Sequence, residues 1–328
     1  MIADAAMLAF ARANDLLGAD EDGAWVPLTG GVSSDIWHLA SSRGEVCIKR
    51  ALAQLKVAAT WEAPVDRNAY EWAYMQVADA IAPNAVPRPV AQDEALGLFA
   101  MAWLAPDQHI LWKSELLARR ADPAFAAQVG MLIGRIHAGT ARNPAIPDAF
   151  ATDGNFHALR IEPYLLATAA AHPDLAPVIG AAADALANTH LALVHGDVSP
   201  KNLLVGPAGP VLLDAECAWY GDPAFDLAFC LNHLAIKARV VDGTRDALLA
   251  SFDALAAAYI ARVDWEAPAD LETRAARLLP MLALARVDGK SPLEYLDEAH
   301  RGALRQAARA AIQAAPQTLA AARDLIVS

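Results

Sequence analysis

The chain has 328 residues, which is enough for two compact lobes and a large hydrophobic core. It carries 26 Lys and Arg against 38 Asp and Glu, a formal net charge of −12 at pH 7, and no run of basic residues, which argues against a nucleic-acid-binding protein. The three cysteines are widely separated, and neither a signal peptide nor an apolar run of roughly 18 residues is visible, so we expect a cytoplasmic protein without a membrane span.

The first hundred residues predict a small lobe made of a sheet and two helices. Apolar spacing indicates a helix over residues 3–17, ended by Gly18, and a second helix over about 65–82. Strands are predicted within 25–39, 45–50, 90–93 and 97–104. The last of these strands ends before Pro106, so we place the boundary between the lobes at about residue 105, giving lobes of 1–104 and 105–328.

Candidate phosphate-binding groups lie in this small lobe. Between the first two strands the chain has Gly30, Gly31, Ser33 and Ser34, where glycines let backbone N–H groups approach phosphates closely. Lys49 follows on the next strand and Glu71 lies on the second helix, at a place where it can pair with the lysine. The alternatives are a plain turn, an exposed lysine and a solvated helix face. Glu62 is a rival partner for Lys49, although it precedes Pro64 and so falls outside the helix.

The second lobe is predicted to be mainly helical. Asp122-Pro123 is typical of a helix start, with the helix running to about His137. Residues 144–164 are rich in Pro, Asp and aromatic residues and predict a loop with short elements, and a helix follows over about 176–189. Asp222-Pro223 indicates another helix start, and two or three helices are expected to fill the remainder.

The strongest chemical pattern lies between residues 193 and 216. An apolar strand leads into His195-Gly196-Asp197, Asn202 follows five residues after the aspartate, and a second strand leads into Asp214-Ala215-Glu216. Phosphoryl transfer uses one carboxylate to orient a hydroxyl nucleophile and further oxygen ligands to hold Mg²⁺ against the phosphates of ATP. The pattern therefore predicts a kinase active site.

His195 and Asp226 are expected to have structural roles near this pattern. His195 with Asp197 is also compatible with a metal site and hence a metallohydrolase, but no second His/Asp cluster with ligand spacing accompanies it, so we expect His195 to hold the loop. We expect Asp226 to anchor the same loop through backbone N–H groups.

A late polar segment, 285–295, admits two interpretations. Gly289 suits a helix end, and Ser291, Pro292 and Glu294 match the start of a capped helix. The alternative is that the segment lines an acceptor pocket, with Arg286 and Lys290 as candidates for contact with a substrate or a phosphate.

Three patterns together resemble the aminoglycoside phosphotransferase family: His195-Gly196-Asp197 with Asn202, then Asp214-x-Glu216, then Gly221-Asp222-Pro223-x-x-Asp226-Leu227. That family belongs to the protein-kinase-like small-molecule kinases, alongside choline, homoserine and methylthioribose kinases. The likeness is strongest over 194–227 and weakens beyond about residue 235. It implies an α+β, bilobal protein-kinase-like fold, with a small antiparallel-sheet N-lobe and a mainly helical C-lobe.

The resemblance also implies roles for single residues. Asp197 is similar to the catalytic aspartate, and Asn202 and Asp214 to the magnesium ligands. Lys49, held by Glu71, resembles the phosphate-binding lysine. The adenine-binding hinge is implied at Met101, Ala102 and Trp103.

The sequence departs from the family pattern at two positions. Glu216 stands where many relatives carry a second Asp, and its longer side chain serves either a second metal or only the waters of that metal. Ala102 stands where an acidic residue is common, but this position is expected to offer mainly backbone groups to adenine.

The expected activity is therefore transfer of the γ-phosphate of ATP, with Mg²⁺, to a hydroxyl group of a small molecule. Alternatives are a catalytically silent nucleotide-binding protein and a protein kinase, although the chain lacks an Asp-Phe-Gly stretch. The acceptor stays open among antibiotics, amino alcohols, sugars and lipid-like alcohols, and the oligomeric state is not indicated.

Overall fold

The structure is a computed structural model that describes residues 4–28, 34–51 and 67–328. Its contacts divide the chain into two compact units, Met1–Gln108 and His109–Ser328. The boundary expected from sequence lies at about residue 105, and the functional roles of the two lobes stay predictions. Among the described residues, no helix is both long enough and apolar enough to cross a membrane.

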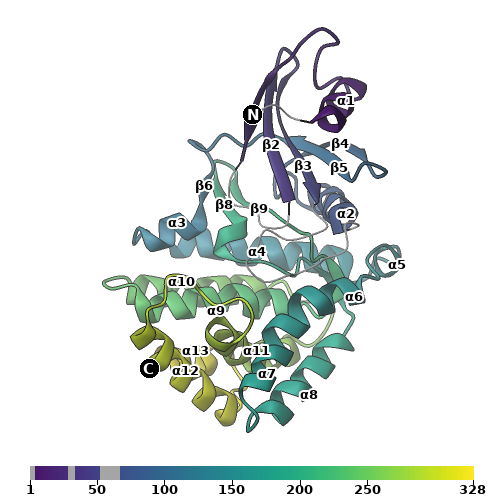
Figure 1. Cartoon of the computed structure of the whole chain (residues 1–328). Coiled ribbons are helices and arrows are strands. Elements are labelled where there is room, and N and C mark those ends of the chain that lie inside the picture. The colour runs from purple at the N-terminus through teal and green to yellow at the C-terminus, as the bar shows by residue number, and fades with distance from the viewer. Residues whose placement is uncertain (1–3, 29–33, 52–66) are drawn as a thin grey trace. The chain divides into compact units, whose positions relative to one another are not determined.

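The N-terminal unit is built on a five-stranded antiparallel sheet with the order β1-β2-β3-β5-β4 (Figure 1). Its strands are β1 (Ala24–Pro27), β2 (Ser34–Ser41), β3 (Gly44–Ala51), β4 (Pro89–Asp93) and β5 (Leu98–Ala102). Its helices are α1 (Ala5–Ala13) and α2 (Arg67–Ile81). The predicted strands and the helix that carries Glu71 are confirmed.

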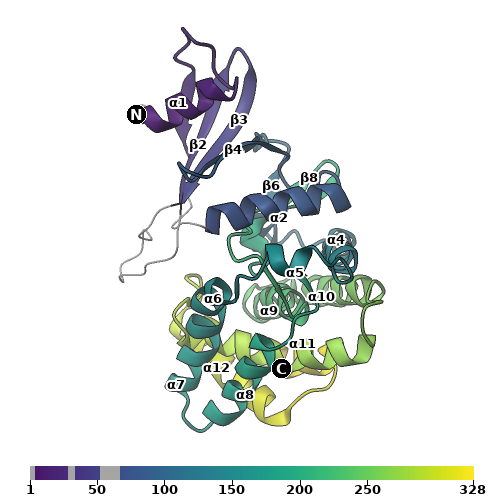
Figure 2. The same cartoon turned by 90° about the vertical axis from the view of Figure 1, so that its right-hand side faces the viewer.

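Helix α1 packs against the sheet and closes the core of this unit (Figure 2). It begins at a capped end, where the Asp4 carboxylate accepts a hydrogen bond from Met7 N at 2.9 Å. It ends earlier than predicted because Asp15 adopts a left-handed conformation with φ +55°. The buried cluster beneath it consists of Met7, Phe10, Ala11, Leu16, Leu17, Leu39, Ile48, Leu98 and Ala100.

The C-terminal unit is mainly helical and contains two small sheets. Its helices up to the catalytic loop are α3 (Trp112–Leu117), α4 (Pro123–Thr140), α5 (Ile146–Ala149), α6 (Asp153–Phe156), the π-helix η1 (His157–Leu166), α7 (Ala167–Ala171) and α8 (Ala176–Ala187). The later helices are the short 3₁₀ helix η2 (Pro200–Asn202), α9 (Ala224–Val240), α10 (Arg245–Ile260), α11 (Pro268–Asp288), α12 (Glu298–Ala314) and α13 (Leu319–Val327). The sheets pair β10 (Trp219–Gly221) with β7 (Ala192–Val194), and join β6 (Ile110–Leu111), β8 (Leu203–Gly206) and β9 (Gly209–Leu212).

Helix α9 forms the centre of the C-terminal unit and packs against α10 and α11 (Figure 1). Its side chains are buried all round, as expected for a helix whose apolar residues are not confined to one stripe. Burying side chains such as Phe225, Leu227 and Phe229 stabilises the fold by roughly 1.5–3 kcal/mol each. Four helices follow α9, so the prediction of two or three is wrong.

The prediction of a loop with short elements over residues 144–164 fits the short helix α5 but is wrong from Asp153 onward. After the short helix α5, helices α6, η1 and α7 run without a break from Asp153 to Ala171. Pro163 lies inside this helical stretch, where a proline normally removes a hydrogen bond and breaks an α-helix. Here the wider π-helical turns surround the proline, and Ala167 N donates to Glu162 O five residues earlier.

Candidate active site

A buried ion pair stands at the centre of the N-terminal unit. Lys49 lies on β3 and Glu71 on α2, and their Nζ and Oε2 atoms are 2.6 Å apart with both side chains 3% exposed. The predicted pairing of these two residues is confirmed. The contact fixes the position of the lysine, and removing one partner of such a buried pair is strongly destabilising. Its role in binding phosphate stays a prediction.

Only part of the predicted glycine-rich turn is described. Gly30, Gly31, Ser33 and the rival Glu62 lie outside the described residues. Ser34 opens β2 and is 3% exposed. Its hydroxyl has no hydrogen-bond partner among the residues that the structure describes.

The predicted hinge consists of Met101 and Ala102, the last two residues of β5, and of Trp103 directly after the strand. The Ala102 N–H donates to Arg88 O at 2.9 Å, so this donor is already used within the unit. The Trp103 ring stacks on the His38 ring, with 4.0 Å between the ring centroids. Met101 stands opposite Cys47 on β3. Contact between this segment and adenine stays a prediction.

In the C-terminal unit, strand β7 leads into residues 195–202, which are the predicted catalytic loop. The strand pairs with β10 and ends at Val194, so His195, Gly196 and Asp197 leave the sheet at one point. Gly196 has φ +76°, and a Cβ atom there would lie 2.6 Å from Cys217 O. Only glycine fits this turn without distortion.

Asp226, on α9, anchors this loop as predicted. Its carboxylate accepts hydrogen bonds from His195 N at 2.7 Å and Gly196 N at 2.9 Å. The same carboxylate contacts His137 Nε2 at 3.2 Å, and His137 Nδ1 lies 2.8 Å from the hydroxyl of Tyr259. Because every member of this chain is buried, the network fixes the loop to the helical core.

His195 has a structural role, as predicted. Its ring is 1% exposed, and its Nδ1 accepts a hydrogen bond from Asp197 N at 3.2 Å. Burial lowers the pKa of His195, against the opposite effect of the Asp226 charge, so the neutral ring is favoured.

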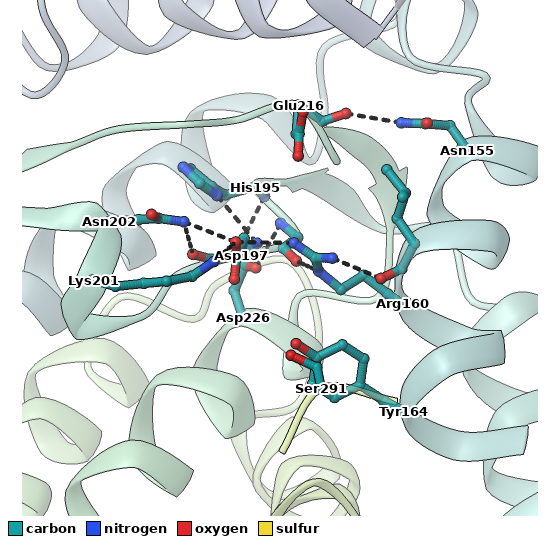
Figure 3. Close-up of polar contacts among 12 residues, drawn as sticks. Asn155, Arg160, Tyr164, His195, Asp197, Lys201, Asn202, Glu216, Asp226 and Ser291 are labelled. Atoms are coloured by element: carbon teal, nitrogen blue, oxygen red, sulfur yellow. Dashed lines mark hydrogen bonds and ion pairs between the residues drawn. The ribbon is translucent and has the colours of Figure 1, made fainter. Parts of the chain in front are cut away.

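The carboxylate of Asp197 is held at one oxygen only (Figure 3). Its Oδ2 accepts from Asn202 Nδ2 at 2.8 Å and pairs with Arg160 Nη2 and Lys201 Nζ, each at 3.0 Å. Its Oδ1 has no hydrogen-bond partner among the described residues. Burial acts to raise the pKa of Asp197, but the charges of Arg160 and Lys201 outweigh it and hold that pKa below its usual value. The carboxylate is therefore ionised, fixed in orientation, and able to accept one further hydrogen bond.

Arg160 is the residue that the sequence analysis missed. It lies on η1, in the segment predicted to be a loop, and its side chain is 9% exposed. Besides Asp197, its guanidinium donates to Gly196 O and to Leu159 O. Lys201 was overlooked as well, although its spacing of four residues from Asp197 was a usable signal.

Asn202 and Asp214 are brought to neighbouring positions by the β8–β9 hairpin. Leu203 stands opposite Leu212, and Leu213 N donates to Asn202 O at 2.9 Å, so Asp214 follows directly after this contact. Asp214 has φ +65°, a conformation that aspartate tolerates better than most residues. Farther along, the backbone carbonyl of Glu216 accepts from Asn155 Nδ2 at 2.8 Å.

This donor set fits a hard divalent cation. Mg²⁺ binds through oxygen and is usually held by one or two carboxylates, with waters and substrate phosphates completing the shell. Asp214 offers a carboxylate, and Asn202, whose Nδ2 is turned to Asp197, offers its amide oxygen. Across the described parts of the chain, no group of three or more His, Cys, Asp and Glu side chains is placed to hold a metal ion by itself.

The segment 285–295 forms a helix end but no new helix start. Helix α11 ends at Asp288 with Gly289 as its cap, as predicted, but the next helix starts only at Glu298, so a capped helix at Ser291 is wrong. The reason is that Ser291 is engaged elsewhere: its carbonyl and hydroxyl oxygens accept from Arg286 Nη1 at 2.9 and 3.0 Å. Lys290 pairs with Glu162 at 2.6 Å on the surface.

Comparisons with known proteins agree with this architecture. The chain is 23% identical over 278 residues to methylthioribose kinase 1 of Oryza sativa subsp. japonica, a match that covers 74% of this chain and 64% of that kinase. The chain thus spans less than two thirds of the length of this relative.

Two solved structures show the shared fold. One is a choline/ethanolamine kinase family protein from Mesorhizobium loti, with 17% identity, a TM-score of 0.52, and coverage of 100% of this chain and 99% of that one. The other is an amicoumacin kinase in complex with AMP-PNP and Ca²⁺, with 13% identity, a TM-score of 0.58, and coverage of 96% and 95%. The predicted α+β protein-kinase-like fold is confirmed. A family model described as "Phosphotransferase enzyme family" matches residues 24–261, and the chain therefore belongs to that family.

Proposed function

We propose that this protein is an ATP- and Mg²⁺-dependent kinase that transfers the γ-phosphate to a hydroxyl group of a small molecule. The observation that carries the proposal is the asymmetric environment of Asp197. One carboxylate oxygen is fixed by Arg160, Lys201 and Asn202, and the other has no partner among the described residues. This arrangement suits a group that receives a hydroxyl and orients it.

Each residue then has a definite task. Asp197 Oδ1 accepts the hydrogen bond of the acceptor hydroxyl and aligns its oxygen for attack, with proton transfer following as phosphorus is approached. Asn202 and Asp214 are the residues that would hold Mg²⁺, and the bound ion would offset charge on the phosphoryl oxygens. Lys49, fixed by Glu71, supplies a positive charge for the nucleotide phosphates. Glu216 is proposed only as a further ligand for a second metal or its waters.

The similar proteins support a small molecule as acceptor. The relatives include a methylthioribose kinase, and the solved structures with this fold include an amicoumacin kinase that holds AMP-PNP and Ca²⁺. These relatives act on different compounds, so they favour the class of reaction without selecting one acceptor.

The test is ADP release by the full chain with Mg-ATP and a panel of small hydroxyl compounds. We expect Asp197→Ala to lower turnover by roughly two orders of magnitude or more, while Mg-ATP still raises the melting temperature as in the wild type. The matched control is Asp264→Asn, because the Asp264 side chain is 62% exposed and paired with Arg142 at the surface.

Near-normal turnover by Asp197→Ala would refute the assignment. Stabilisation by Mg-ATP with no turnover across the panel would instead indicate a catalytically silent nucleotide-binding protein. A peptide-phosphorylation screen tests the protein-kinase alternative, and elemental analysis for a tightly bound transition metal tests the metallohydrolase alternative.

A further inference from the structure

Beside the predicted catalytic loop, helices α9 and α11 bury two basic side chains that have no carboxylate partner among the described residues. Arg286 is 5% exposed and Lys237 is 1% exposed. Among the described residues, neither has a carboxylate oxygen within 4.0 Å of its nitrogens. Together with His233, which contacts Arg286 Nη2 at 3.3 Å, they form what we call the basic cluster.

The three members of the basic cluster face one another. His233 and Lys237 are four residues apart on α9 and so lie on the same side of that helix. Arg286 meets that side from α11. Burial and then the Arg286 and Lys237 charges lower the pKa of His233, so its ring is neutral and accepts from the guanidinium.

The hydrogen-bonding groups around the cluster are neutral. Arg286 Nη1 donates to the hydroxyl of Tyr164 at 2.9 Å and to both oxygens of Ser291, while Nε has no partner among the described residues. Lys237 Nζ donates to the hydroxyl of Tyr295 at 3.2 Å. Nε is therefore the nitrogen of Arg286 from which a carboxylate or phosphate oxygen can accept a hydrogen bond, beside the Nη2 that already donates to His233.

The nearby carboxylates already have cations of their own. Glu294 pairs with Lys113, and Glu162 pairs with Lys290. Asp197 is occupied by Arg160 and Lys201. Among the described residues, no carboxylate therefore pairs directly with the basic cluster. The negative charge that acts on Lys237 and Arg286 is that of Glu294, which is itself paired with Lys113.

The cluster also lies next to the proposed reaction site. Arg160, which pairs with Asp197, and Arg286 both lie over the rings of Tyr164 and Phe229, at 5.3 to 5.9 Å from the ring centroids. Two aromatic rings thus separate the cluster from the arginine that holds Asp197. Ser291 and Tyr295, which contact Arg286 and Lys237, are partly exposed, and Lys201, whose charge acts on His233, is half-exposed.

We propose that the acceptor carries an anionic group, a carboxylate or a phosphate monoester, which binds the basic cluster while a hydroxyl of the same molecule meets Asp197. The inference rests on the proposed function. It restricts the acceptor of the proposed kinase reaction to hydroxy acids and phosphorylated hydroxyl compounds. An ammonium-bearing acceptor is disfavoured, because it would add a like charge beside Arg286 and Lys237.

The experiment uses the full chain and four matched arms of acceptors. They are hydroxy acids (glycerate, gluconate), phosphate esters (glycerol 3-phosphate, glucose 6-phosphate), neutral polyols (glycerol, glucose) and amines (ethanolamine, glucosamine). ADP release reports turnover, and the melting temperature without nucleotide reports binding of the same compounds. We expect one anionic arm to exceed its neutral counterparts in kcat/KM by tenfold or more, on the order of one charge-assisted hydrogen bond.

Variants of Arg286 and Lys237 distinguish binding of the acceptor at the basic cluster from a general effect of the protein's charge. Arg286→Gln should raise KM for the anionic acceptor by roughly ten- to a hundredfold with a smaller change in kcat. Lys237→Met should act in the same direction, and it removes a buried ammonium, so it does not threaten folding. The control Lys290→Gln removes an equal charge that has its own surface partner, and KM should stay within about twofold.

The outcomes distinguish this inference from the proposed function. A preference for the neutral or amine arm, or equal losses for charged and neutral acceptors in Arg286→Gln, overturns the anionic acceptor while the kinase activity stands. Thermal stabilisation by an anionic arm that disappears in Arg286→Gln, without turnover in any arm, supports the anion site and overturns the kinase. If the anionic compounds show no binding and no turnover, the inference is overturned.

Discussion

The buried Lys237 makes a quantitative prediction about stability and pH. Burial, followed by the charges of Lys113 and Arg286, lowers the pKa of Lys237 from 10.5 to about 7. At roughly 1.4 kcal/mol per pH unit, that fall in pKa corresponds to about 5 kcal/mol of destabilisation when the lysine is charged in the folded state.

The sign of the effect follows from proton binding. Below pH 7 the lysine is protonated in both states, so the folded protein carries the whole penalty. Between pH 7 and 10.5 the unfolded chain binds more protons than the folded one, and the free energy of unfolding therefore rises with pH through this group.

Lys237→Met isolates this contribution. At pH 6 we expect the free energy of unfolding of the variant to exceed that of the wild type by several kcal/mol. The lost hydrogen bond to Tyr295 reduces this gain by about 1 kcal/mol. Near pH 10 the gain should vanish, because Lys237 is then largely neutral in both states. Urea unfolding at both pH values measures the difference, and groups that titrate in both proteins cancel. A difference between the two proteins that is equal at pH 6 and pH 10 would refute this account of Lys237. An anionic acceptor that binds Lys237 should also reduce the low-pH penalty of the wild type.

Three further substitutions probe the positions that fix the proposed sites. Lys49→Met should destabilise the protein by about 3–5 kcal/mol in urea unfolding because it leaves Glu71 buried and unpaired, and the double variant with Glu71→Leu should recover most of that loss. Arg160→Gln should lower kcat by roughly ten- to a hundredfold with little change in KM for ATP, and an unchanged kcat would remove Arg160 from the positioning of Asp197. Gly196→Ala should lower the melting temperature far more than Gly97→Ala, because φ is positive at both sites but the added Cβ would meet a backbone oxygen at 2.6 Å only at residue 196.

The parts of the fold that the sequence predicts are those whose signals are local. Asp122 followed by proline starts α4, with the Asp122 carboxylate accepting from Ala124 N at 2.8 Å. The strands of the N-terminal sheet follow from apolar runs separated by turns. The catalytic loop was found because Asp197 and Asn202 are close in sequence, and Asp226 because its carboxylate suits exposed backbone N–H groups.

The parts that were missed depend on tertiary packing. Pro163 and the polar residues around it indicate a loop, but packing of η1 against α8 and α11 keeps this segment helical. The missing N–H of proline costs less in a π-helical stretch, whose hydrogen-bond pattern already departs from that of an α-helix. Contacts outside the local sequence also explain why the predicted helix start at Ser291 is wrong, since the competing hydrogen bonds come from Arg286 on the preceding helix.

The site residues that the sequence predicts differ in proposed chemical role from those that it does not predict. The groups proposed to orient the hydroxyl and to hold the metal come from one loop and one hairpin, so their spacing along the chain predicts them. Arg160 and Arg286 lie on helices that are far apart in the sequence, and both side chains lie over the rings of Tyr164 and Phe229. The proposed reaction type therefore rests on a short motif, whereas the proposed acceptor rests on side chains that only folding brings together. The basic cluster is buried among neutral hydrogen-bonding groups, and no short pattern in the sequence predicts this arrangement.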